Sequence, residues 1–233
     1  MKESEKGREL HGLAETLREK GEFENALEHT DNATIAYVED GDVRGLAEVQ
    51  SSRQLTFGHL YYETGAPEYR ILQKHAAMAA VEIAELSGEP EALGIPYFNL
   101  GKYYFDANEY RSAEEYFKKA VENLSTVPNS RHGRPSVIAD VKGHLHVAEY
   151  YLGDKSALEK SLKALEDLEK AEEASYEKNV WMSGAHLRIA NMIKNDQTDL
   201  AQHHLQKAKE IIDSDERLVL RKKQLDKLEQ QFK

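Results

Sequence analysis

Apolar residues between positions 95 and 123 recur at the spacing of two consecutive amphipathic helices. The first stripe follows the spacing i, i+3, i+4 and i+7 and consists of Tyr97, Leu100, Gly101 and Tyr104. After a polar break at 107–109, the second stripe consists of Tyr110, Ala113, Phe117, Ala120 and Leu124. Gly101 and Ala113 are small where two helix backbones would approach closely, whereas Tyr104 and Phe117 are large where the neighbouring space must be filled. The stretch therefore predicts one helical hairpin.

The hairpin pattern repeats along the chain with a period of about 44 residues. One position of the second helix is alanine in every repeat, namely Ala33, Ala77, Ala120, Ala164 and Ala208. The second repeat departs from the pattern because it has Arg70 where the others have alanine, and Arg188 interrupts the stripe of the last repeat. We expect a single array with hairpins at 3–41, 42–87, 88–127, 135–175 and 176–213, followed by a capping helix at 214–233.

The succession of an aromatic residue, Leu-Gly, Tyr, a turn, and then Ala, Phe and Ala in residues 97–120 resembles the tetratricopeptide repeat (TPR). Tyr97 stands where that repeat usually has Trp, and the closing Pro is absent. The resemblance implies an all-α, right-handed solenoid whose concave groove binds peptides or proteins. Because the period exceeds the usual TPR length of about 34 residues, we expect long helices. Long-helix arrays of this kind resemble the sensor domains of bacterial peptide-pheromone receptors and of large signalling ATPases.

Composition narrows the class of partner. The net charge of −11 argues against nucleic acid, because phosphate binding requires a basic surface. The chain has no cysteine, so it forms no disulfide framework. The polar N-terminus is unlike a signal peptide, and no apolar run reaches the roughly 18 residues of a membrane span. We expect a cytoplasmic protein that has no membrane contact and binds another protein.

The usual signatures of catalysis and metal binding are missing from the sequence. Ten histidines occur, but no Glu-x-x-His or His-Glu-x-x-His sequence is found. His144 and His146 point to different faces of a helix. There is no glycine-rich phosphate loop and no Gly-x-Ser-x-Gly sequence. The sequence therefore predicts no metal site, no cofactor and no enzymatic activity.

The resemblance to TPR arrays implies that the first helix of each hairpin lines a ligand groove. The residues at groove positions are His11, Glu15, His59, Tyr62, Phe98, Lys102, Phe105, Lys142, His146 and His186. This mixture suits an extended peptide, since aromatic rings bury apolar side chains while Lys and His pair with carboxylates. The alternative is that the charged residues contact only water and that Phe98 and Phe105 pack between repeats. If the histidines keep a pKa near 6.5, binding would change between about pH 6 and 7.5.

The longest irregular stretch is 125–135, which is locally basic. Arg131, His132 and Arg134 predict a second binding site for an acidic partner. The alternative is an ordinary loop between helices.

Two further interpretations accompany the prediction of a peptide-binding scaffold or adaptor. The first is an intracellular sensor of a small signalling peptide that acts on a separate partner. The second is a homo-oligomeric structural protein, or a weak homodimer, held together through 214–233. This last segment has apolar residues near heptad spacing at Leu218, Leu225, Leu228 and Phe232.

Overall fold

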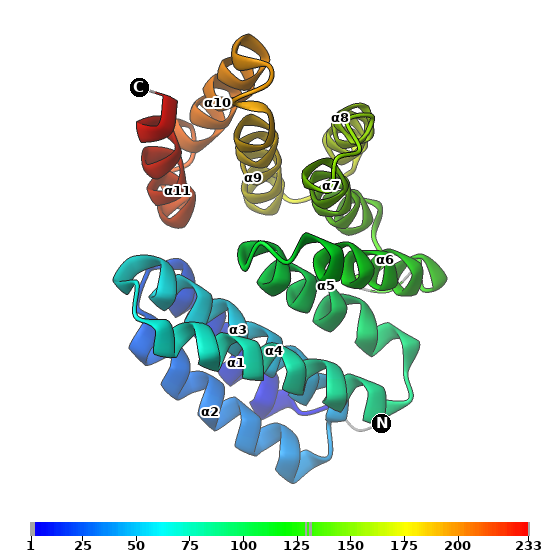
Figure 1. Cartoon of the computed structure of the whole chain (residues 1–233). Coiled ribbons are helices and arrows are strands. Elements are labelled where there is room, and N and C mark those ends of the chain that lie inside the picture. Colours follow the sequence, from blue (N-terminus) through cyan, green and yellow to red (C-terminus); the bar gives the residue numbers. More distant parts are fainter. Residues whose placement is uncertain (1–2, 129, 131, 233) are drawn as a thin grey trace. The chain divides into compact units, whose positions relative to one another are not determined.

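The computed structural model describes all residues except 1–2, 129, 131 and 233, and the described part is helical with no strand (Figure 1). Its helices are α1 (Glu5–Glu19), α2 (Phe23–Asp40), α3 (Val43–Thr64), α4 (Pro67–Ser87), α5 (Pro90–Asp106), α6 (Tyr110–Thr126), α7 (Pro135–Tyr151), α8 (Ala157–Lys170), α9 (Ser175–Ile193), α10 (Thr198–Asp213), α11 (Val219–Glu229) and the 3-10 helix η1 (Gln230–Phe232). Consecutive helices pack in pairs from α1/α2 to α9/α10. The fold class is an all-α solenoid, as predicted.

The chain divides into two compact units, Met1–Val127 and Pro128–Lys233. In unit 1 the first helices of successive hairpins also touch, α1 against α3 and α3 against α5, while α2 and α4 each pack on the following helix. In unit 2, α9 contacts α7, α8 and α11. The first helices begin at residues 5, 43, 90, 135 and 175, so their spacing varies along the chain. The exact repeat limits and the single array stay predictions.

Asp42 joins three helices of unit 1 at one point. Gly41 adopts the left-handed conformation that ends α2, with φ of 71°. Asp42 then caps α3, because its Oδ1 accepts a hydrogen bond from the backbone N–H of Gly45 at 2.8 Å. Its Oδ2 accepts a second one, at 2.9 Å, from the backbone N–H of Ser4, the residue that caps α1. One carboxylate therefore fixes the starts of α1 and α3 relative to each other.

Small residues allow the helices of each hairpin to approach closely. The five alanines in repeat phase are at most 4% exposed. Gly101 on α5 faces the ring of Phe117 on α6, and a Cβ at Gly101 would lie 2.6 Å from that ring. The two helices thus approach closely at Gly101, as its small size predicts, and the large Phe117 ring fills the space beside it. Pro96 lies inside α5, which begins at Pro90.

The two arginines that interrupt the sequence pattern connect neighbouring hairpins. Arg70 on α4 donates to the backbone carbonyl of Tyr103 on α5 at 2.8 Å, and its guanidinium lies 4.4 Å from the centre of the Tyr103 ring. Arg188 on α9 forms an ion pair with Asp140 on α7, and both side chains are mostly buried. An arginine at these positions replaces apolar packing with a directed polar contact.

The helix α11 covers the last hairpin of unit 2. Leu218, Leu225 and Leu228 are buried in one cluster with apolar residues of α9 and α10. This arrangement is the expected cap on the end of a helical array. Dimerisation through 214–233 stays a prediction, and it would have to use the side of α11 that does not carry these leucines. Among the described helices, none has both the length and the apolar character needed to cross a membrane.

Candidate functional site

Two helical stripes on α3 and α5 form the candidate binding surface of unit 1. Each stripe follows the spacing i, i+4 and i+7, and the two helices contact each other. We call the six residues the α3–α5 surface: Leu55, His59 and Tyr62 on α3, and Phe98, Lys102 and Phe105 on α5. Tyr62 is 38% exposed and the other five are half-buried. The surface thus offers partly exposed aromatic rings beside a lysine.

The aromatic residues of α5 are held by the second helix of their hairpin. The ring of Phe98 lies 5.9 Å from that of Phe117, and the ring of Phe105 meets that of Tyr110 edge to face at 5.3 Å. The Lys102 ammonium lies 5.3 Å from the centre of the Phe98 ring. These contacts restrict the side chains before any ligand arrives.

The histidine of α3 is also packed on one side. The His59 ring stacks on Phe23, at the start of α2, with ring centres 5.6 Å apart and planes 5° from parallel. One face of His59 is therefore used inside unit 1.

On α1 the predicted groove residues lie deeper. His11 is only 9% exposed, and its Nδ1 lies 3.4 Å from the Tyr37 hydroxyl. Its Nε2 lies 4.0 Å from the Glu15 carboxylate, whose side chain is half exposed. Burial raises the pKa of the Tyr37 hydroxyl, so Tyr37 stays protonated and can donate to His11. Glu15 is thus the more accessible residue of this pair.

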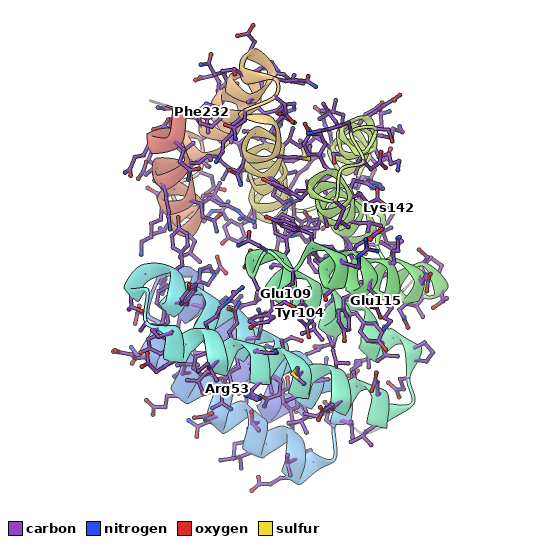
Figure 2. The ribbon with its side chains drawn as sticks, viewed as in Figure 1. Arg53, Tyr104, Glu109, Glu115, Lys142 and Phe232 are labelled. Atoms are coloured by element: carbon purple, nitrogen blue, oxygen red, sulfur yellow. The ribbon has the colours of Figure 1, made fainter. Side chains whose placement is uncertain are left out.

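The remaining three groove residues belong to unit 2. Lys142 on α7 is exposed and is labelled in Figure 2. The Nδ1 of His146 lies 2.9 Å from the Glu149 carboxylate, which also binds Lys160 at 3.4 Å. Lys142 therefore presents the most accessible charge of the three.

His186 is buried against His204 between α9 and α10. The two Nδ1 atoms are 2.9 Å apart, so one ring donates the hydrogen bond and the other accepts it. Burial, together with the neighbouring histidines, lowers the pKa of His186 to about 4. His186 is thus uncharged between about pH 6 and 7.5, and the expected titration in this range does not apply to it.

In the basic loop, Arg131 lies outside the described residues and His132 is half-buried. The Nε of Arg134 lies 3.2 Å from the Glu173 carboxylate, and its guanidinium is 5.7 Å from the centre of the Trp181 ring. Its charge is therefore matched within unit 2, at the start of α7.

Metal and small-molecule sites find little support. In the part of the chain that the structure describes, no group of three or more His, Cys, Asp or Glu side chains could hold a metal ion. A cavity of about 10 Å³ lies beside Asp140, Ser161 and Arg188 in unit 2. This volume suits a single water molecule and is far too small for a substrate.

Comparison with known proteins supports the fold. No protein-family model and no curated protein matches the chain. Among solved structures, BtubC (BKLC) from P. vanneervenii matches with a TM-score of 0.58 and 18% identity, covering 89% of this chain and 80% of that one. Nearly identical TPR-like repeats of a kinesin-light-chain-type protein from Podosopora anserina match with a TM-score of 0.56 and 16% identity, covering 91% and 97%. At these identities the likeness shows a TPR-like helical-repeat fold.

Proposed function

We propose that the chain is a protein-binding scaffold and that the α3–α5 surface binds an extended segment of its partner. The observation that carries the proposal is the pair of stripes on contacting helices, with Tyr62, Phe98 and Phe105 partly exposed beside Lys102. Aromatic rings bury the apolar side chains of a ligand, and a lysine binds a carboxylate. The preferred segment therefore combines apolar and acidic residues.

The packing behind the surface favours binding. Phe98 and Phe105 already lie against Phe117 and Tyr110, so fixing them on a ligand costs little side-chain entropy. A partner that binds by its own extended backbone would meet a surface that is largely formed in advance.

A peptide-display selection against the full-length protein tests the proposal. Enriched peptides are synthesised, and their affinity is measured by fluorescence anisotropy. We expect Tyr62→Ala to raise Kd roughly 30-fold, which corresponds to the loss of about 2 kcal/mol typical of a central aromatic contact. Lys102→Glu should weaken acidic peptides strongly and neutral peptides little, because it reverses one charge.

Matched controls separate binding from folding. Tyr151→Ala removes a tyrosine of similar exposure, 36%, at the end of α7 and should leave Kd unchanged. Circular dichroism should show the same unfolding midpoint for Tyr62→Ala and wild type. Equal affinity of all four proteins would contradict the proposal and move the site to another surface, with Lys142 or the basic loop tested next.

Finer statements about the function remain predictions. A sensor would bind a free signalling peptide at the same surface and then act on a separate protein. It differs from a scaffold because its activity needs the peptide and the protein partner together. Cytoplasmic location is likewise a prediction from the sequence. Assembly through 214–233 is tested by deleting that segment and measuring the mass in solution.

A further inference from the structure

The second helices of the hairpins differ in what they present to solvent. On α6, α8 and α10 the large exposed side chains are charged or polar, for example Arg111, Glu115, Lys118 and Glu122 on α6. On α4, by contrast, Ile71 is 59% exposed, Leu72 45% and Leu86 84%. The helix α2 also exposes two aliphatic side chains, Ile35 at 57% and Val38 at 60%, whereas α4 exposes three. Exposed aliphatic side chains gathered on one helix are typical of an interaction surface.

These residues lie on one face of α4 by helical geometry. Leu72, Ala79 and Leu86 are spaced by seven residues, and the exposed His75 and Glu82 lie between them at i+3. The opposite face of α4 is buried in unit 1 and carries Gln73, Ala76, Ala77, Ala80 and Ala84. The outward face is therefore a continuous strip along the helix, and we call it the α4 strip: Ile71, Leu72, His75, Ala79, Glu82 and Leu86.

We propose that the α4 strip binds the α4 strip of a second copy of this chain, with the two helices antiparallel and Ala79 at the two-fold axis. The argument is self-complementarity, which a two-fold contact requires. With Ala79 opposite Ala79, Leu72 falls opposite Leu86 of the second copy. His75 then lies within one residue, about 1.5 Å along the helix axis, of the level of Glu82 of the second copy, and its imidazole N–H can donate to that carboxylate.

The length of α4 allows an extended contact. A helix of 21 residues is about 30 Å long, so some five turns of each copy can take part. Ala79 at the crossing lets the helix axes approach to about 8 Å. The leucines would form the apolar centre and the two His75–Glu82 pairs the polar rim, as in known interfaces.

Sedimentation velocity over a wide range of protein concentration tests the proposal. We expect a reversible dimer in the wild type. Leu72→Glu and Leu86→Glu should each raise the dimer Kd at least a hundredfold, because each substitution occurs twice in a symmetric contact. The matched control is Val38→Glu, which alters an aliphatic residue of α2 that is 60% exposed, and it should leave Kd within about twofold. All three sites are exposed, so circular dichroism should show intact folding.

Two further variants test the antiparallel register. His75→Glu should weaken the dimer by placing like charges near Glu82, and adding Glu82→Lys should restore it. Because the chain has no cysteine, Ala79→Cys introduces the only thiol. Under mild oxidation it should give a disulfide-linked dimer, whereas Val38→Cys should not.

Three results would overturn the proposal. The wild type could be monomeric at every concentration, in which case the strip faces solvent or serves another protein. The dimer could persist in Leu72→Glu and Leu86→Glu. It could also be lost only on deletion of 214–233, which would assign the contact to the C-terminal helix.

Discussion

The hairpins α5/α6 and α9/α10 place different chemistry at one position of the repeat. Phe98 on α5 and His186 on α9 stand two repeats apart in the predicted pattern. Phe98 packs on Phe117 through aromatic rings, whereas His186 shares a buried hydrogen bond with His204. The repeat thus sets where the two helices meet, and the residue type sets how that contact responds to pH. An aromatic contact does not depend on a proton, but a histidine pair does.

The largest expected effect is acid destabilisation of the histidine pair. Burial lowers the pKa of both His186 and His204 from 6.5 to about 4. Since the folded pKa lies below the unfolded one, their contribution is complete above about pH 6.5 and is lost as pH falls towards 4. We expect the free energy of unfolding to drop by a few kcal/mol across this window. Urea unfolding followed by Trp181 fluorescence measures it, because this single tryptophan lies on α9.

Replacing the histidine pair with apolar residues, as found in α5/α6, separates its acid response from that of the carboxylates. Asp215 is one such carboxylate, and Arg217 holds its pKa low. In His186→Phe with His204→Leu, the loss of stability between pH 6.5 and 4 should be smaller than in wild type by that same few kcal/mol. An equal loss in both proteins would show that other groups govern the acid response.

A smaller loss of stability is expected where Gly101 on α5 packs against Phe117 on α6. In Gly101→Ala the new Cβ would lie 2.6 Å from a carbon of the Phe117 ring, so one of the two must move. Overpacking of this kind costs about 1–3 kcal/mol. Thermal unfolding measures it, and combining Gly101→Ala with Phe117→Leu should recover part of the loss. A neutral single substitution would mean that the two helices separate easily at this point.

The sequence predicts the repeated helices better than it predicts the site. Periodic stripes and alanines in phase depend on local spacing, so the helical hairpins could be predicted, as could the small residue at Gly101 and the large one at Phe117 where the helices meet. The two arginines appear in the sequence only as interruptions, because their partners, the Tyr103 carbonyl and Asp140, lie on other helices. The burial of His186 could not be predicted either, since its partner His204 lies on the next helix and the groove position alone indicates solvent. The α4 strip does have a sequence signal, the seven-residue spacing of Leu72, Ala79 and Leu86, but this spacing is separate from the period of about 44 residues that marks the hairpins.

The smallest expected effect concerns Gly143, a glycine that packing does not require, in contrast to Gly101. Gly143 lies in α7, and a Cβ there would meet only the Arg188 guanidinium, at 3.6 Å, an ordinary contact. Gly143→Ala should therefore stabilise unit 2 by up to about 1 kcal/mol, because alanine restricts the unfolded chain and favours the helix. The midpoint of thermal unfolding should rise by about 2–4 °C. A fall instead would mean that Arg188 cannot yield at this point, so that its ion pair with Asp140 needs the space that glycine leaves.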